Sequence, residues 1–187
     1  MAEIGVTEGV VEKQDSEIIS NLLQMVTVRA KDIMTPRMVV RLASEEQTIK
    51  DFYKSAGILP FSRIPLFEDN DKEHVSGYFL KAELLEVLVK GNGDNLLKTI
   101  KRDITVLHEN MPISELFNHL LKQREHIALL VDEYGGMAGI VTMEDVMETL
   151  LGTEITDESD KTTDMQALAR KKWEQRARRI GLIDDDP

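Results

Sequence analysis

The stretch Gly139-Ile140-Val141-Thr142-Met143-Glu144-Asp145 joins a short apolar segment to a helical pattern. Residues 138–141 predict a strand, and the apolar side chains that follow at helical spacing predict a helix that begins near Met143. Thr142 stands where an N-cap belongs, and Asp145 follows three residues later in the first helical turn. The stretch therefore predicts a strand that runs directly into a capped helix.

This junction could also bind a ligand. A helix N-terminus presents free N–H groups and a partial positive charge, which suit phosphate. The hydroxyl of Thr142 can bond a phosphate or ribose oxygen, and the carboxylate of Asp145 can accept bonds from two ribose hydroxyls. Together they indicate a nucleotide, and the simpler alternative is that the two residues only cap the helix.

A degraded copy of the same pattern lies upstream, at residues 76–88. In this alignment Gly77 matches Gly139, Leu80 matches Thr142, and Glu83 matches Asp145. Further upstream, residues 63–66 are aligned with 126–129, and residues 32–34 with 103–105. Two copies of this length predict a pseudo-symmetric pair of small α/β units, each burying its sheet against its partner.

Both units follow one order of elements. In the first we expect an extended segment at 39–42, a helix opening near Thr48, strands at 63–67 and 75–80 around a polar turn, and a closing helix at 81–90 with Leu84, Leu85 and Leu88 inward. In the second we expect an extended segment at 106–107, a helical stripe over 113–121, a buried strand at 127–131, and a glycine-containing hairpin turn at 132–136.

Three motifs in this order carry a family resemblance: residues 32–37 (DIMTPR), 62–67 (SRIPLF), and 131–136 (VDEYGG) followed by 139–145 (GIVTMED). With them, residues 8–160 resemble the tandem cystathionine-β-synthase (CBS) domain pair, or Bateman module, of the CorC/hemolysin-C-like and CNNM-related magnesium/cobalt transport family. The fold class expected is α/β (α+β), with two pseudo-symmetric CBS units, each a small sheet with flanking helices, plus N- and C-terminal helices.

The resemblance implies ATP binding, often with Mg²⁺, at one of two clefts. It assigns Thr142 and Asp145 to ribose and phosphate, Thr35 to a contact near the start of the first unit, and residues 61–65 to the base, the sugar and the phosphates. The expected binding residues are Thr35, Phe61, Ser62, Arg63, Pro65, Ile127, Thr142 and Asp145.

The residue chemistry agrees with this assignment in part. The guanidinium of Arg63 can form a bidentate bond with phosphate, although a surface salt bridge is the alternative. In the degraded copy Leu80 lacks a hydroxyl, and Glu83 carries its carboxylate on a longer arm. We therefore expect one competent cleft and one weak or empty one.

Composition narrows the function classes. The formal net charge of −11 over 187 residues argues against nucleic acid as a partner, and requires a local cation such as Mg²⁺ beside ATP. There are no cysteines, and the four histidines show no metal-ligand spacing. No nucleophile elbow is present either, so we expect no catalytic residue, no metal site of the protein's own, and no enzyme activity. The acidic run at 154–160 reads as solvated, with a weak divalent-ion contact as the alternative.

The expected domains are residues 1–28 as an N-terminal linker and helix, 29–92 as the first CBS unit, 93–153 as the second, and 154–187 as an acidic linker and a basic amphipathic helix. The N-terminal helix carries an apolar face over residues 18–26 and either transmits a signal or covers a sheet edge. The C-terminal helix, with Trp173 on its apolar side and six Lys or Arg on the other, could touch anionic lipid or dock on the acidic module, which we favour.

The predicted function is an adenine-nucleotide sensor, with Mg²⁺-dependent ATP binding, in a magnesium/cobalt transport protein. The alternatives are a pair that binds AMP or S-adenosylmethionine, or a dimerisation scaffold with a vestigial cleft. No apolar run is long enough to span a bilayer, and the resemblance places a membrane domain N-terminal to the module. We expect a soluble fragment that works at the cytoplasmic face of the inner (plasma) membrane, as a homodimer built through the closing helices.

Overall fold

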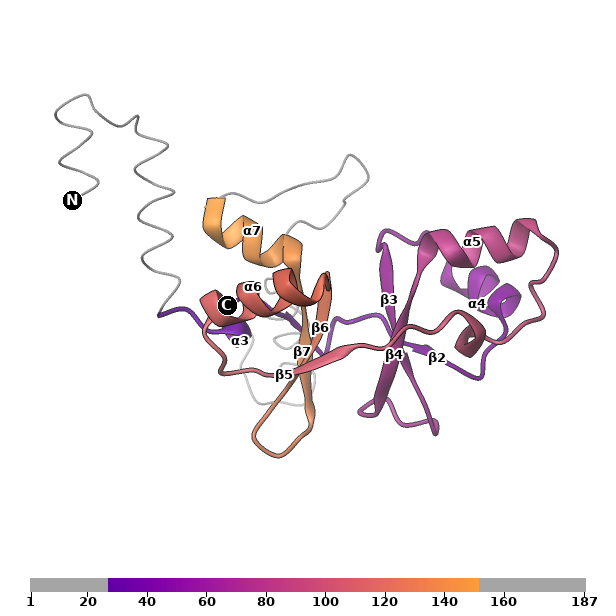
Figure 1. Ribbon diagram of the computed structural model, residues 1–187. Coiled ribbons are helices and arrows are strands. Elements are labelled where there is room, and N and C mark those ends of the chain that lie inside the picture. Colours follow the sequence, from indigo (N-terminus) through magenta and orange to yellow (C-terminus); the bar gives the residue numbers. More distant parts are fainter. Residues whose placement is uncertain (1–26, 152–187) are drawn as a thin grey trace, which may run out of the picture.

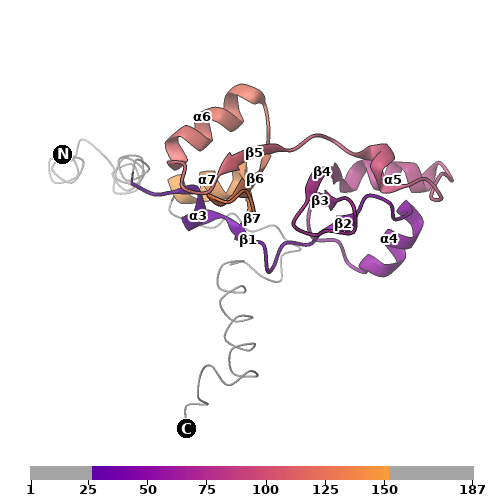
Figure 2. The same cartoon turned by 90° about the horizontal axis from the view of Figure 1, so that it is seen from below.

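The computed structural model describes residues 27–151, so the expected terminal helices and the acidic run lie outside the described residues. The described chain forms two small mixed α/β units that lie next to each other (Figures 1 and 2). Each unit has its own sheet, one of three strands and one of four, flanked by helices. This is the fold class that the repeat predicts.

The first unit is a three-stranded sheet in the order β2-β3-β4, with two α-helices and one short 3₁₀ helix. Its strands are β2 (Ala43–Ser44), β3 (Arg63–Phe67) and β4 (Val75–Leu80), and its helices are α4 (Ile49–Ala56), α5 (Lys81–Val89) and the short 3₁₀ helix η1 (Leu97–Ile100). β2 runs parallel to β3, and β4 runs antiparallel to it. The oxygen of Thr48 accepts the Asp51 N–H and so caps α4, as the sequence predicts.

The second unit repeats this order and adds one strand at the sheet edge. Its elements are α3 (Ala30–Ile33), β1 (Thr35–Pro36), β5 (Thr105–His108), α6 (Ile113–Gln123), β6 (Ile127–Val131), β7 (Met137–Thr142) and α7 (Met143–Leu151), with sheet order β1-β7-β6-β5. β5 is parallel to β6, and β7 pairs antiparallel with both β6 and β1. Gly135 supplies the positive φ in the turn between β6 and β7.

Each unit receives a crossing segment from the other half of the chain. β1 precedes the first unit in sequence but pairs with β7 of the second, with Thr35 opposite Ile140. Arg102 precedes the strands of the second unit but bridges to Tyr78 in β4 of the first. Leu97 of η1 likewise packs in the core of the first unit. The domain bounds stay a prediction. Residues before the boundary expected between 92 and 93 pack on the second unit, and residues after it pack on the first.

The sheet registers correct the internal alignment. Leu66 lies opposite Gly77, and Leu130 lies opposite Gly139, so Arg63 corresponds to Ile127 and not to His126. The crossing segments shift further, because Thr35 and Arg102 occupy matching places beside the residues that follow the two glycines. The alignment of residues 32–34 with 103–105 is therefore wrong by four positions.

Gly77 and Gly139 are required by these crossings. A Cβ built on Gly139 would lie 2.4 Å from the carbonyl oxygen of Thr35, and one on Gly77 would lie 2.4 Å from that of Arg102. Backbone oxygens in a paired segment cannot move aside as a flexible side chain can. The paired glycines therefore allow the close approach that holds each crossing segment on its sheet.

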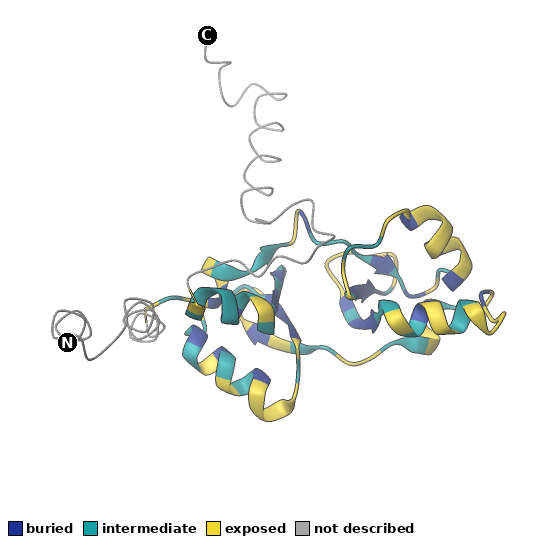
Figure 3. Ribbon diagram, turned by 90° about the horizontal axis from the view of Figure 1, so that it is seen from above, coloured by how far each residue is buried: buried dark blue, intermediate teal, exposed yellow. Residues whose placement is uncertain are grey.

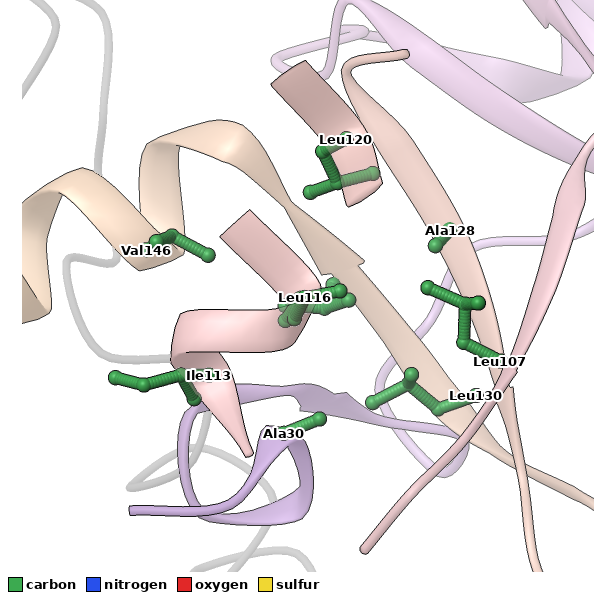
Figure 4. Close-up of a cluster of buried hydrophobic side chains, with 9 residues drawn as sticks. Ala30, Leu107, Ile113, Leu116, Leu120, Ala128, Leu130 and Val146 are labelled. Carbon is green, nitrogen blue, oxygen red and sulfur yellow. The ribbon is translucent and has the colours of Figure 1, made fainter. Parts of the chain in front are cut away.

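Side chains on alternate faces of each sheet serve two purposes. One face of each sheet packs on the helices of its own unit. In the first unit the side chains on this face are Ile64, Leu66 and Phe79. In the second they are Ala128, Leu130 and Val141, and the helix residues Leu116, Leu120 and Val146 cover them (Figure 4). The opposite faces meet each other through a smaller cluster built on Val75, Leu129 and Met137. The space between the two sheets is thus where both units can contribute to one site.

Several local expectations need correction. The extended segment expected at 39–42 begins one residue later, because Val39 lies in a turn, and pairing with β3 begins only at Ala43. Leu85 is exposed, whereas Leu84 is fully buried and Leu88 is partly buried, so Leu85 lies at the outer edge of the apolar stripe of α5. Figure 3 shows that the helices of both units carry buried as well as exposed residues. The short elements α3, β1 and η1 were not predicted, because two to four residues carry no periodicity.

The crossing contact yields a stability prediction. Gly139→Ala and Gly77→Ala should each lower the free energy of unfolding by about 1–3 kcal/mol or more, because the new methyl group overlaps backbone. Urea denaturation followed by circular dichroism measures this. Two variants as stable as the wild type would show that the crossing segments are not held against these glycines.

Candidate nucleotide-binding site

Three of the predicted site residues share one face of the second sheet. Ile127 lies directly opposite Thr142 across β6 and β7, and Thr35 lies opposite Ile140, two residues before Thr142. Cross-strand partners and residues two apart project from the same face of a sheet. Thr35, Ile127 and Thr142 therefore lie on the face that is turned toward the first unit.

Thr142 and Asp145 form a closed hydrogen-bonded cap at the start of α7. The Thr142 hydroxyl donates to Asp145 Oδ2 at 2.8 Å, and the Thr142 N–H donates to the same oxygen at 2.6 Å. The Asp145 N–H in turn donates to Thr142 Oγ1 at 3.3 Å. The helix cap is thus confirmed, and it also fixes the orientation of a hydroxyl and a carboxylate at the sheet edge.

The environment of Asp145 is costly for its charge. Burial raises the pKa of the Asp145 carboxyl from 3.8 to about 6, against the lowering effect of the two Thr142 hydrogen bonds, with small further raises from Glu148 and Glu144. A simple surface cap such as Thr48 with Asp51 has no need of a buried carboxylate. A partly buried acid with a raised pKa at a sheet edge is a feature more typical of binding sites than of caps.

Arg63 reaches this junction from the other unit. It is the first residue of β3, lies opposite Leu80, and so projects from the face of its sheet that is turned toward the second unit. Its Nη1 lies 3.8 Å from Glu144 Oε1 at the start of α7, and its side chain is 21% exposed. The guanidinium is therefore close to the cap, held by one weak and partly solvated ion pair.

The remaining predicted residues lie beside Arg63. Pro65 is buried in β3, on the same face as Arg63. Phe61 and Ser62 precede β3 and are exposed, and the Ser62 carbonyl accepts the Lys81 N–H at 2.9 Å. The structure thus brings Thr35, Ile127, Thr142 and Asp145 together in the second unit and places Arg63 across from them, with Phe61 and Ser62 on the adjacent surface.

In the degraded copy, the positions that match Asp145 and Thr35 are occupied by an ion pair, Glu83 with Arg102. Leu80 occupies the place of Thr142 and makes no side-chain cap at the start of α5. Glu83 occupies the place of Asp145, and its carboxylate accepts bonds from both Nε and Nη2 of Arg102, the Nε contact at 3.3 Å. Because Arg102 stands where Thr35 stands in the other copy, a long cation fills the space that is lined by a small hydroxyl there.

Glu144 and Arg102 were missed by the sequence interpretation. Glu144 looked like an ordinary first-turn acid, and only the fold brings it to Arg63. Arg102 was missed because the crossing segments were aligned wrongly. Aligning the repeat on the two glycines alone would not have located it either. A residue's place before a strand of one unit does not show that it pairs with the other unit.

Comparison with known proteins agrees with this architecture. The sequence model of the CBS domain family matches residues 97–152. A UPF0053 protein of Synechocystis sp. is 35% identical over 182 residues, which are 97% of this chain and 52% of that protein. The magnesium and cobalt efflux protein CorC of Escherichia coli is 27% identical over 177 residues, 94% of this chain and 59% of that protein.

Solved structures agree with these relatives. The CBS domain of a bacterial CNNM/CorC family Mg²⁺ transporter superposes with a TM-score of 0.78 at 29% identity, covering 83% of this chain and 94% of that one. The chain folds as a CBS-domain module and is similar in sequence and structure to those of the CNNM/CorC family. A structure of that family's CBS domain in complex with ATP has a TM-score of 0.70 at 29% identity and covers 75% of this module. The module spans about half the length of the curated relatives it matches.

Within residues 27–151 no helix has the length and apolar character needed to cross a membrane.

The partly buried carboxyl of Asp145 yields a pH prediction. Between pH 3.8 and about 6 the folded module holds a proton on Asp145 that the unfolded chain has released, so ionisation of Asp145 lowers stability as pH rises through this window. The free energy of unfolding of Asp145→Asn minus that of the wild type should therefore increase by about 1–3 kcal/mol from the acid end of the window to the neutral end.

Urea denaturation across the pH range measures this difference. Asp51→Asn, which removes the carboxylate of the exposed Thr48 cap of α4, is the matched control. Parallel pH curves for wild type and Asp145→Asn would contradict the burial of an ionising group at this cap.

Proposed function

We propose that this module binds ATP together with Mg²⁺ at the Thr142–Asp145 junction, and that binding regulates a magnesium/cobalt transport protein. The observation that carries the proposal is the partly buried, hydrogen-bonded carboxylate and hydroxyl at the start of α7, facing a cation from the other unit. It is supported by the related CBS domain solved in complex with ATP.

Each group has a part in this proposal. The Asp145 carboxylate accepts ribose hydroxyls, as far as it is ionised, and the Thr142 and Thr35 hydroxyls bond sugar or phosphate oxygens. Ile127 and Pro65 supply apolar surface on the two facing sheets, with Phe61 and Ser62 at the rim. Arg63 exchanges the carboxylate of Glu144 for the more highly charged phosphates.

Mg²⁺ follows from the charge of the site. Glu144, Asp145 and Glu148 all lie in the first two turns of α7, and the chain as a whole carries −11. A triphosphate beside them needs more positive charge than Arg63 provides. Mg²⁺ is held mainly by phosphate oxygens and water, so it offsets this repulsion without a site made by the protein alone.

The regulated protein is inferred from the relatives. CorC is named as a magnesium and cobalt efflux protein, and the solved neighbours are named as parts of Mg²⁺ transporters. We infer that the module acts at the cytoplasmic side of the membrane, attached to a transport domain, and has no catalysis of its own. Nucleotide binding between the units then alters how they pack, and the change passes to that domain.

A homodimer fits the outer surface of the closing helices. On α5, Leu85 and Val89 are exposed, and on α7, Leu151 is exposed as well. The surplus is smaller than the sequence suggested, because Leu84 and Val146 are fully buried and Val87, Leu88 and Leu150 pack on their own cores. We infer that the remaining apolar side chains meet their counterparts across a twofold axis.

The first functional prediction concerns Thr142. Thr142→Ile should weaken binding of ATP with Mg²⁺ by at least about 1–3 kcal/mol, because it removes a hydrogen bond and adds bulk. Leu80→Ile, at the matching position of the other copy, is the control and should leave affinity unchanged. Isothermal titration calorimetry with ATP, AMP and S-adenosylmethionine, with and without Mg²⁺, measures both.

Three outcomes are decisive. Equal affinity of wild type and Thr142→Ile for ATP would overturn the site. Tighter binding of AMP or S-adenosylmethionine than of ATP would replace the ligand, and no binding of any of the three would leave a scaffold with a vestigial cleft. Circular dichroism checks that the variant folds, which the apolar Leu80 at the equivalent position leads us to expect.

The second functional prediction concerns the dimer. Val89→Glu should weaken self-association by about tenfold or more, because it places a charge in an apolar contact. Ile58→Glu is the matched control: Ile58 is 78% exposed and Val89 is 89% exposed, but Ile58 lies outside the closing helices. Sedimentation equilibrium at tens of micromolar protein distinguishes them, and a monomeric wild type with and without nucleotide would refute the dimer.

A further inference from the structure

A cavity lies between the two units, on the side of the degraded copy. It has a volume of about 520 Å³. The residues that line it come from both halves of the chain: Arg63, Tyr78, Leu80, Lys101, Arg102, Asp103, Arg124, Glu125 and His126. Four of these are Arg or Lys and two are Asp or Glu, a concentration of cations that stands out in a chain of net charge −11.

The four cations differ in how firmly they are held. Lys101 is fixed, because its Nζ lies 2.7 Å from Oε2 of the buried Glu45, which also accepts the Ser76 hydroxyl. Arg102 is paired with Glu83, but its side chain is half exposed. Among the described residues, Arg63 has a single ion pair, the 3.8 Å contact with Glu144. The Arg124 guanidinium makes no ion pair within residues 27–151.

Arg124 is placed by the backbone and not by a partner. It ends α6 in the left-handed conformation, with φ of 58°, and its N–H closes the helix on Leu120 and Leu121. This fixed αL turn sets the direction in which its side chain leaves the chain, next to Glu125 and His126 at the entry to β6. Three guanidinium groups, two of them loosely paired or unpaired, thus border one cavity.

The same residues exclude a nucleoside. Leu80 stands where Thr142 supplies the proposed ribose-binding hydroxyl in the other copy, and it makes no side-chain cap. Glu83 stands where Asp145 does, and its carboxylate already accepts two hydrogen bonds from Arg102. What the cavity offers instead is planar N–H forks, which match the oxygens of a phosphate group. An ion pair that is partly exposed contributes little, so a multivalent anion can displace Glu144 or Glu83 at small cost.

We propose that this cavity binds a compact multivalent anion of the phosphate class, such as diphosphate, through Arg124, Arg63 and Arg102. The cleft that lost its nucleoside-binding groups has thereby become a separate anion site. Because Arg63 borders this cavity and also contacts the start of α7, an anion here competes for the guanidinium that the nucleotide site uses. This last link rests on the proposed function, whereas anion binding itself does not.

The test uses the whole 187-residue chain and sodium diphosphate as the probe. Calorimetry at low ionic strength should show binding in the wild type, and NMR should show shifts of Arg side-chain Nε–Hε signals that include Arg124. Arg124→Gln should lower the affinity for diphosphate by about tenfold or more. Lys122→Gln is the matched control, since Lys122 is exposed on α6 and does not line the cavity.

The outcomes separate this site from the nucleotide site. Thr142→Ile should keep diphosphate binding while it loses ATP, and Arg124→Gln should keep ATP binding while it loses diphosphate. No heat and no Arg shifts with diphosphate in the wild type would overturn the proposal. Equal losses in Arg124→Gln and Lys122→Gln would overturn it too, because they would show attraction to charge in general.

Discussion

The close passage of one backbone segment over a glycine, made once in each unit, is the contact on which this structure depends. Thr35 crosses Gly139, and Arg102 crosses Gly77, each at a distance that leaves no room for a Cβ. The first segment comes before one unit and pairs with the other, and the second does the reverse. Neither sheet is therefore complete without chain from the opposite half, and the units are held with their open sheet faces toward each other.

This exchange also decides what stands in each cleft. The residue that crosses the glycine lies next to the cap of the closing helix, so its side chain becomes part of that cleft. In the second unit it is Thr35, beside the hydroxyl and carboxylate of Thr142 and Asp145. In the first it is Arg102, which binds Glu83. One repeated scaffold thus supports two different chemistries, one suited to a nucleoside and one rich in guanidinium groups.

Much of the fold could be predicted from the sequence, because its long elements bury alternating or helical apolar patterns. Strands 63–67, 75–80 and 127–131 have the predicted bounds, and the cap at Thr142 forms as expected. The short elements could not be predicted in this way. β1 has two residues, one of them Pro36, and its pairing is set by the space over Gly139 and not by its own pattern.

In the candidate site, too, the features set by local sequence could be predicted, and those set by the tertiary fold could not. Thr142 and Asp145 carried their signal locally, in a cap spacing that the structure reproduces. The approach of Arg63 to Glu144, and the filling of the other cleft by Arg102, depend on which sheet faces meet. Neither contact follows from the repeat pattern, because each joins residues from different units.

The most direct test of this account is a crystal structure of the module grown with ATP and Mg²⁺. The account predicts the adenosine between the two sheets with its ribose at Thr142 and Asp145, its phosphates at Arg63, and no nucleoside at Leu80 and Glu83. Adenosine bound at Leu80 and Arg102, or in both clefts alike, would contradict it.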